Sequence, residues 1–489
     1  MKSIPKEYNV VVACGFTALL MLGGFGYFAF DSLSLESEGL EALAAVSEKI
    51  EKFNKSTTPP TDSYLKELVE QKNELIYSLY DELNTGRLKL EPYPASLRIM
   101  NLIRFVNMNE ISSIDKTQFL KYIKSESNYL EQNLEFHILG NHLLENLFAL
   151  KMVKSLFEED ASKIEKLLMV QLNEQILIDG AHFELSPMYH KIILFRMLEM
   201  YTYISENDML KSFTKEKIDA MHSWLKNIGF SNGEVPAFND STTGITFSNA
   251  FLFTLCQSIS KNQKNLGLSD SGYRMFNTEN FELAIDVHGI SPSYQPGHAH
   301  ADTFSFCLNY ENTPYIVDTG ISTYNISKRR TWERSTNAHN TIEINNENSA
   351  EVWSGFRVGR RLKVKILEED KNHLKASHNG YKRFNIDVLR EIDIDPKSEI
   401  ISIIDKLVGK INGNTSQLNI HFHPSVKIVK IKENVYQLNE KLLITFEGDI
   451  NTKLDFFEYS EAYNSFSTAT KLIVELNSET CKTFIYSIK

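Results

Sequence analysis

The longest unbroken apolar stretch of the chain lies near its N-terminus. Residues 10–30 read VVVACGFTALLMLGGFGYFAF, which is 21 consecutive positions without a charged side chain. A helix of that length spans about 30 Å, the thickness of a bilayer core. Lysines precede the run and acidic residues follow it: Lys2 and Lys6 before, then Asp31, Glu36 and Glu38. This asymmetry predicts a membrane anchor within segment 1–31, with a cytoplasmic N-terminus and an exported body.

Segment 1–31 has two alternative interpretations. It resembles a cleaved signal peptide, although the apolar run is long and no A-x-A site follows it cleanly. A buried core helix is the other alternative, and it would make the protein cytoplasmic. An anchor or a signal places the protein in the cell envelope, either membrane-anchored or periplasmic.

Helical periodicity dominates the next two segments. Residues 32–84 form a charged helical lead-in, with amphipathic helices predicted over 35–57 and 62–84 and a linker at 56–60. From 85 to 270 apolar residues recur at steps of three and four, as in Ile164, Leu167, Leu168, Leu172 and Ile176. Consecutive helices with short breaks predict an array of helical hairpins.

The period changes to two in the last segment, residues 271–489. Four alternating patterns predict strands: Phe281, Leu283, Ile285 and Val287; Phe304, Phe306, Leu308 and Tyr310; Leu362, Val364 and Ile366; Leu418, Ile420 and Phe422. Turn signals such as Asn412-Gly413-Asn414 separate them. Helices followed by antiparallel strands predict an α+β multidomain protein rather than a doubly wound sheet.

Composition and charge exclude several classes of protein. The 489 residues are 42% hydrophobic and 24% charged, as in ordinary globular chains. The formal net charge is −11, which argues against a nucleic-acid partner. The four cysteines, Cys14, Cys256, Cys307 and Cys481, lie too far apart for a disulfide scaffold or a zinc ribbon. No glycine-rich phosphate loop and no G-x-S-x-G motif is present, so no organic cofactor is expected.

Two helical motifs carry candidate chemistry. In the first, Asn141, His142 and Glu145 lie within one helical turn, and His142 and Glu145 are three residues apart on one face. A helical Asn-His pair is more often structural than functional. In the second, Tyr189 follows Ser186-Pro187, a loop that opens the next helix. A lone tyrosine is normally a core or rim residue.

Histidines in the strand region form the other candidate sites. His298 and His300 would share one face if their segment is extended, although a surface histidine pair is an equally simple interpretation. Asp318 ends a predicted strand, and His339 begins another. His300, Asp318 and His339 offer two imidazoles and one carboxylate, a ligand set that zinc accepts.

Five motifs in this order resemble the heparinase II/III-like polysaccharide lyases. They are EPYPASLRIMN (91–101), LGNHLLEN (139–146), DGAHFELSPMYH (179–190), GHAHADTFSF (297–306) and RSTNAHNTIEIN (334–345). The resemblance covers roughly residues 85–365. It implies an N-terminal incomplete α/α toroid followed by an antiparallel β-sandwich, which agrees with the change of period.

The resemblance also implies β-elimination at a uronic acid of an acidic polysaccharide. Asn141 and His142 would neutralise the carboxylate of the substrate, and His298 is a further candidate for this role. Tyr189 would act as acid and base, His298 would be the second catalytic group, and Glu145 would support the site. Because the free phenol has a pKa of about 10, a nearby cation or hydrogen-bond donor would have to favour the phenolate.

Two further expectations concern the metal and the substrate. Carried over from metal-bearing relatives, His300, Asp318 and His339 would hold one structural zinc, which supports the floor of the site. Arg98 and Arg334 are the basic candidates for contact with the substrate. We expect Asn141, His142, Tyr189 and His298 to converge on one cleft, within roughly 10 Å.

Departures from the family pattern leave other functions open. The aromatic-rich segment that usually precedes the PYP-S-R-like motif is absent, and the apolar run and acidic helices stand in its place. A uronate C5-epimerase would need the same acid and base on the same fold. A non-catalytic glycan-binding or assembly factor is the alternative outside the enzymes. The sequence does not specify the polymer, the mode of cleavage or the oligomeric state.

Overall fold

The computed structural model describes residues 62–109, 111–206, 208–260 and 265–488. The predicted membrane segment 10–30 and the predicted helix 35–57 lie outside this part of the chain, so both stay predictions. Within the described ranges, every helix is too short or too polar to cross a bilayer.

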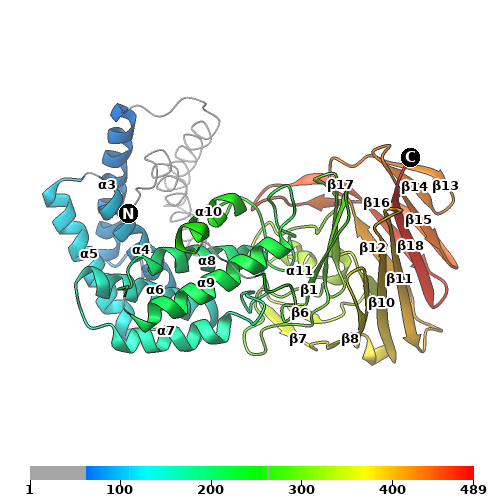
Figure 1. Cartoon of the computed structure of the whole chain (residues 1–489), viewed down its shortest axis with the longest axis horizontal. Helices are drawn as coiled ribbons and strands as arrows, with labels where there is room; N and C mark the ends of the chain where they lie inside the picture. The colour runs from blue at the N-terminus through cyan, green and yellow to red at the C-terminus, as the bar shows by residue number, and fades with distance from the viewer. Residues whose placement is uncertain (1–61, 110, 207, 261–264, 489) are drawn as a thin grey trace. The chain divides into compact units, whose positions relative to one another are not determined.

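Helices fill the first part of the described chain (Figure 1). They are α3 (Asp62–Asn84), α4 (Pro92–Met108), α5 (Ser113–Gln132), α6 (Gly140–Leu156), α7 (Ser162–Gln175), α8 (Pro187–Tyr201), α9 (Met209–Ile228) and α10 (Asn249–Ile259). The hydroxyls of Ser112 and Ser248 accept backbone N–H bonds at the starts of α5 and α10. The predicted apolar face of α7 is confirmed, since Ile164, Leu168 and Leu172 are buried.

The chain divides into two compact units that differ from the predicted domains. The described residues of the first unit are 62–109, 111–171, 199–206 and 208–211, in which α4 packs against α5 and α6. Those of the second are 172–198, 212–260 and 265–488, which include most of α9, all of α10 and all the strands. The change from helix to strand nevertheless falls between Ile259 and Tyr273, close to the predicted position.

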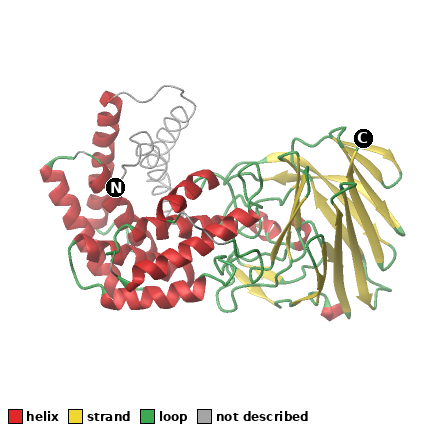
Figure 2. Ribbon diagram, viewed as in Figure 1, coloured by secondary structure: helices red, strands yellow, loops and turns green. Residues whose placement is uncertain are grey.

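Strands of the second unit form an antiparallel sandwich (Figures 1 and 2). The eight-stranded sheet has the order β13 (Ile428–Lys432), β14 (Val435–Leu438), β15 (Leu442–Glu447), β18 (Thr480–Ser487), β11 (Ile400–Gly409), β10 (Ile386–Asp395), β9 (His373–His378) and β8 (Val364–Glu369). One four-stranded sheet has the order β16 (Ile450–Tyr459), β17 (Ser467–Leu476), β12 (Ser416–His421) and β5 (Ile342–Ile344). The other consists of β1 (Tyr273–Asn277), β2 (Phe281–Asp286), β3 (Phe306–Tyr310) and β4 (Thr313–Ile316). A hairpin of β6 (Glu351–Trp353) and β7 (Arg357–Gly359) completes the set, with short helices α11 (Lys328–Glu333), η1 (Thr336–Ala338) and η2 (Lys382–Phe384).

One hydrophobic core joins these sheets. Leu283 from β2, Ile392 from β10 and Leu472 from β17 belong to the same buried cluster. Burying such aliphatic side chains contributes roughly 1.5–3 kcal/mol each. The predicted apolar positions of β2, β3 and β12 are buried, but most of the positions between them are buried as well. Ile366 in β8 is 37% exposed because β8 is the edge of its sheet. The predicted order of helices followed by an antiparallel sandwich is confirmed.

Candidate functional site

Three loops of the second unit meet at one buried carboxylate, that of Asp240. They are the loop 182–186 before α8, the loop 237–243 before α10 and the loop 297–303 before β3. Backbone hydrogen bonds hold them together, because Asp240 N donates to His298 O at 3.1 Å and Ser186 Oγ donates to Asp240 O at 2.6 Å.

Asn239 fixes the backbone of these loops next to Asp240. It has a φ of 56°, a left-handed conformation that Asn tolerates better than most residues. Its Oδ1 accepts the backbone N–H of His300 at 2.9 Å, and its Nδ2 donates to Leu185 O at 3.0 Å. Asn239 therefore connects the loop 297–303 (the histidine loop) to the loop 182–186, which leads to Tyr189.

Three side chains, two imidazoles and one guanidinium, contact the carboxylate of Asp240. One oxygen lies 2.9 Å from His298 Nδ1, and the other lies 2.8 Å from His300 Nε2. Arg330 on α11 makes a bidentate pair with the carboxylate, with Nη2 to Oδ2 at 2.7 Å. Burial would raise the pKa of Asp240, but Arg330 and the two imidazoles lower it well below its ordinary value. Asp240 is therefore an ionised acceptor.

His298 has one ring nitrogen fixed by this carboxylate. With Asp240 ionised, the hydrogen bond assigns the proton to Nδ1 and leaves the lone pair on Nε2. Nε2 lies 3.7 Å from a carboxylate oxygen of Glu184. The His298 side chain is 16% exposed, whereas Asp240 is fully buried. The buried Asp240 carboxylate therefore fixes the orientation of the His298 ring, while part of the His298 side chain stays exposed to solvent.

Tyr189 lies against His298. It occupies the first turn of α8, where Pro187 starts the helix and Ser186 Oγ accepts the Tyr189 N–H at 3.2 Å. The centroids of the two rings are 4.0 Å apart. The Tyr189 hydroxyl lies 3.3 Å from that of Tyr324.

Tyr189 differs from the sequence-based expectation in its protonation. Burial raises the pKa of Tyr189 well above its ordinary value of 10, and nearby Tyr463 adds to the rise. The hydrogen bond with Tyr324 acts in the opposite direction without reversing it. The resting side chain is therefore a neutral phenol, which can donate a proton.

The predicted zinc ligands His300, Asp318 and His339 lie near one another, but their ligand atoms are not grouped as they would be around a metal ion. The rings of His300 and His339 are 5.3 Å apart, and His339 Nδ1 lies 2.8 Å from Asp318 Oδ2. His300 Nδ1 and His339 Nε2 are buried without a hydrogen-bond partner, which leaves both nitrogens available as metal ligands. Burial lowers the pKa of His300 to about 3, so its imidazole is neutral, the form that binds a metal. The donor set fits zinc in chemistry, and the metal itself stays a prediction.

Two details of the histidine segments differ from the expectation. His298 and His300 lie in a loop and not in an extended strand, so the reason given for their shared face is wrong. Both reach Asp240 because the loop bends around it. Asp318 lies two residues beyond β4, and His339 follows η1 and precedes β5.

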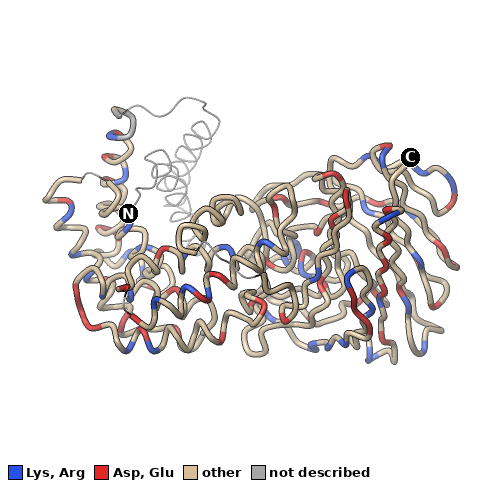
Figure 3. Tube along the Cα trace, viewed as in Figure 1, with Lys and Arg blue, Asp and Glu red and all other residues tan. Residues whose placement is uncertain are grey.

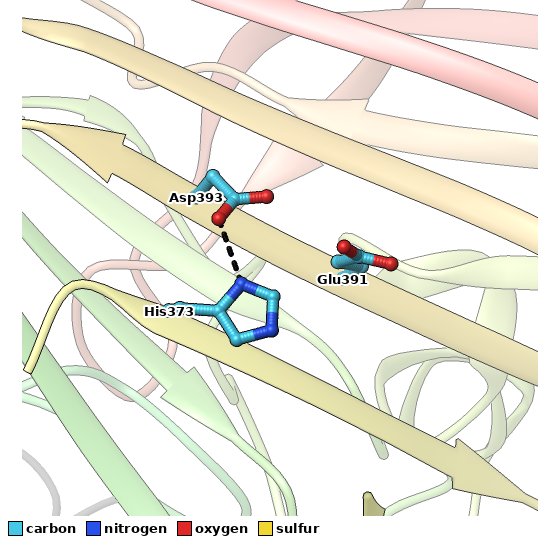
Figure 4. Close-up of side chains that lie close together, drawn as sticks. All are labelled: His373, Glu391 and Asp393. Atoms are coloured by element: carbon cyan, nitrogen blue, oxygen red, sulfur yellow. Dashed lines mark hydrogen bonds and ion pairs between the residues drawn. The ribbon is translucent and has the colours of Figure 1, made fainter. Parts of the chain in front are cut away.

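A different trio brings its ligand atoms together among the described residues. His373 on β9 and Glu391 and Asp393 on β10 have ligand atoms within 4.8 Å of one another (Figure 4). His373 Nδ1 pairs with Asp393 at 2.7 Å, and Lys375 Nζ lies 2.9 Å from Glu391. His300, Asp318 and His339 do not form such a group.

The first unit holds Asn141, His142 and Glu145 at the start of α6. Leu139 and Gly140 both have positive φ, 64° and 57°, and for leucine this strained conformation costs roughly 1–3 kcal/mol. Asn141 and Glu145 are buried, whereas the side chain of His142 is 36% exposed. His142 Nδ1 lies 3.0 Å from Glu135 Oε1, and its ring lies 4.4 Å from that of Tyr93. Backbone strain next to these residues is typical of a functional segment.

The predicted catalytic residues are thus divided between the units. Tyr189 and His298 are brought together in the second unit. Asn141 and His142 belong to the first, so the convergence of all four on one cleft stays a prediction.

The two arginines chosen for substrate contact have internal partners. Arg98 Nε pairs with Glu126 at 2.9 Å, and its side chain is 11% exposed. Arg334 is 1% exposed, and its Nη2 donates to Ala299 O at 2.9 Å. In this structure Arg334 therefore holds the backbone of the histidine loop, and contact of either arginine with a substrate stays a prediction.

Sequence reasoning missed the residues that organise His298 and Tyr189. Asp240, Glu184 and Tyr324 lie in irregular segments, where no periodicity marks them. The dipeptide Asn239-Asp240 was the sequence feature that could have indicated this site, because Asn and Asp often form turns and helix caps in loops.

Two family models match the chain in succession. The model described as Heparinase II/III N-terminus matches residues 62–262, and that described as Heparinase II/III-like, C-terminal matches residues 261–487. The heparin-sulfate lyase of Pedobacter heparinus is 24% identical over 359 residues, which cover 65% of this chain and 51% of that protein. A heparin-sulfate lyase of Bacteroides stercoris is 22% identical, covering 65% and 50%. The chain thus spans about half the length of the curated relatives it matches.

A solved structure shows the same fold. The crystal structure described as heparinase III has a TM-score of 0.68 and 17% sequence identity, with 88% of this chain and 74% of that chain covered. This match confirms the predicted fold class, an incomplete α/α toroid followed by an antiparallel β-sandwich.

Proposed function

Because this chain belongs to the heparinase II/III-like family, we propose that it is a polysaccharide lyase that cleaves a uronate-containing polysaccharide by β-elimination. The pairing of Tyr189 with His298 at 4.0 Å, backed by the buried Asp240 carboxylate, is the observation that carries the proposal. The relatives named heparin-sulfate lyases favour a sulfated glycosaminoglycan as the substrate.

In the proposed reaction the base is His298. Its Nε2 lone pair removes the proton from C5 of the uronic acid, while the Nδ1–H stays bonded to Asp240. The carboxylate of Asp240 stabilises the imidazolium that forms, without taking its proton. The electron pair left at C5 forms the C4–C5 double bond as the C4–O4 bond breaks.

The acid in this scheme is Tyr189. A neutral phenol beside the base can protonate the departing O4, so the elimination does not release an alkoxide. Tyr324 then supports the tyrosinate that remains, because its hydroxyl lies 3.3 Å away. The proton returns to Tyr189 from His298 or from water before the next turnover.

Asn141 and His142 are assigned to the carboxylate of the substrate. Removing the C5 proton requires that this carboxylate be neutralised by donors or a cation. Both residues lie in the first turn of α6, where backbone N–H groups and the helix dipole favour an anion. A zinc held by His300, Asp318 and His339 would add rigidity beneath the histidine loop when bound.

The test is a direct assay for the unsaturated product. The purified chain is incubated with heparan sulfate, hyaluronan, alginate and pectate, and the ultraviolet absorbance of the C4–C5 double bond is followed. A lyase produces this absorbance with new chain ends. Exchange of the C5 hydrogen with deuterated water without the absorbance would identify an epimerase instead. Neither signal with any polymer would overturn the proposal.

A further inference from the structure

The hairpin of β6 and β7 has two chemically different sides. Its register pairs Val352 with Val358 and Trp353 with Arg357. The valines pack with Ala350 and with Ala301, which belongs to the loop 297–303 that carries His298 and His300. On the other side Trp353 is 47% exposed, and Arg357 is exposed as well. The hairpin is therefore anchored to the candidate site while it presents a tryptophan and an arginine to solvent.

The tip of this hairpin contacts residues of the candidate site. Gly355 O accepts a hydrogen bond from Arg330 Nε at 3.2 Å. The ring of Phe356 lies 5.3 Å from that of Tyr324 and 6.2 Å, edge-on, from that of His298. Phe356 is nevertheless 38% exposed. One edge of this ring thus borders the proposed catalytic pair, and part of the ring faces solvent.

Trp353 lies beside Gly359 on β7. An added Cβ on Gly359 would lie 3.2 Å from Trp353 Cζ3, closer than most side chains pack. The indole can therefore rest against the backbone of β7 and keep the rest of its surface exposed. Single exposed apolar side chains are common, whereas two aromatic side chains exposed on one short hairpin, Trp353 and Phe356, are more typical of a binding surface.

The charge of the hairpin is opposite to that of the whole chain. Residues 351–361 contain Arg357, Arg360 and Arg361 against Glu351, which gives 3 − 1 = +2, whereas the chain carries −11. Arg360 Nε lies 3.3 Å from Glu351, but both side chains are about half exposed, so this pair is weak. Figure 3 shows basic residues along the segment that Figure 1 labels β7 and β8.

We infer that residues 351–361 form a sugar-binding subsite for an anionic polysaccharide, next to the scissile linkage. Trp353 and Phe356 stack against the C–H faces of pyranose rings, and Arg357 and Arg360 pair with sulfate or carboxylate groups. This inference rests on the proposed function and names the element that selects long, charged substrates. It assigns no chemical step to the hairpin.

The experiment measures binding apart from turnover. The full chain with Tyr189→Phe is the parent, so that the ligand survives, and the probe is a size-defined heparan sulfate hexasaccharide titrated by calorimetry. Trp353→Ala and Phe356→Ala should each raise Kd about 10-fold, and Arg357→Gln about 3-fold with a weaker dependence on salt. Phe456→Ala is the matched control, because Phe456 is 73% exposed on β16 of a different sheet and should leave Kd unchanged. Equal melting temperatures exclude unfolding of a variant.

The outcomes separate this inference from the proposed function. Wild-type Kd in both aromatic variants would overturn the subsite, even if the native chain yields unsaturated product. Binding that depends on Trp353, without any such product from the native chain, would overturn the lyase and keep the subsite. A parent that does not bind the hexasaccharide at all would overturn the subsite as proposed.

Discussion

Two histidine–aspartate pairs in the second unit have the same hydrogen bond and different surroundings. His298 Nδ1 lies 2.9 Å from Asp240, and His373 Nδ1 lies 2.7 Å from Asp393. Asp240 is fully buried, in loops, and also binds Arg330 and His300. Asp393 is 51% exposed and lies directly opposite His373 on neighbouring strands.

The difference shows what a site needs beyond an imidazole and a carboxylate. The cross-strand pair follows from sheet geometry, since residues opposite each other have neighbouring side chains. The Asp240 pair requires several loops to bend around one charge, and it places the ring of His298 beside the rings of Tyr189 and Tyr324. Only the His298–Asp240 pair combines a fixed base with a neighbouring acid. Perturbing this pair should therefore affect turnover, whereas perturbing the His373–Asp393 pair should not.

Removing the acid should have the largest effect. Tyr189→Phe deletes only the phenolic oxygen, so we expect turnover to fall ~10²–10⁴-fold with the fold intact. Tyr436→Phe is the matched control: its hydroxyl bonds to Thr452 at 2.8 Å, and it lies on β14 in the sandwich. Initial rates of unsaturated product measure both. Near-normal turnover of Tyr189→Phe would remove this tyrosine from the mechanism.

Asp240→Asn should affect both stability and turnover. It leaves Arg330 buried without its counter-ion, which costs roughly 3–5 kcal/mol of unfolding free energy. It also releases His298, so kcat should fall about 10²-fold. Denaturant melts and rates at several substrate concentrations measure the two effects.

A second buried pair separates positioning from stability. Arg390 and Asp405 form a bidentate pair at 2.8 and 2.9 Å inside the sandwich, so Asp405→Asn should cost similar stability. At a temperature where both variants are folded, Asp405→Asn should keep the kcat of the native chain. Equal losses of kcat in the two variants would assign Asp240 a purely structural role.

Loss of the predicted metal should have a smaller effect on activity. His339→Ala, or prior chelation, should lower the melting temperature and reduce turnover roughly 10-fold, because a ligand bound only to the native state stabilises it. His378→Ala is the control, since His378 is a buried imidazole on β9 whose pKa burial lowers to about 3. Elemental analysis of chain purified without chelator should find one zinc that is lost only in His339→Ala. Absence of zinc from the native chain would leave His300 and His339 as two buried imidazoles, hydrogen-bonded to Asp240 and Asp318 respectively.

The comparison of the two pairs also explains what the sequence could predict. The periods of three to four and of two depend on local geometry, so α7, β2, β3 and β12 were found from the sequence. The motifs identified Tyr189 and His298 through resemblance to a family. Asp240 is 58 residues from His298 and 90 from Arg330, and it lies in a loop without periodicity.

Contacts of this kind depend on how loops close and not on any local pattern. Alternation would place His298 and His300 on one face only if their x-H-x-H segment were extended. The structure achieves the same alignment with a bent loop that Asn239 and Arg334 hold by its backbone. Hydrophobic periodicity therefore predicts helices and strands, whereas a buried charge and its partners can be identified only from the tertiary structure.

The smallest effect concerns the pair on the sheet surface. The hydrogen bond with Asp393 raises the pKa of His373, while partial burial opposes the rise. A raised pKa in the folded state means that the protonated form stabilises the fold. This contribution is complete below the unfolded pKa of about 6.5 and is lost as the pH rises through the folded value. His373→Gln should therefore lose at most ~1 kcal/mol of unfolding free energy at pH 5.5 and almost nothing at pH 9, as for other exposed pairs.

Asp393→Asn should show the same dependence on pH, and neither variant should alter turnover. If either one lowered kcat, the contrast between the two histidine–aspartate pairs would be wrong, and the sheet surface around Glu391 would have to take part in the function.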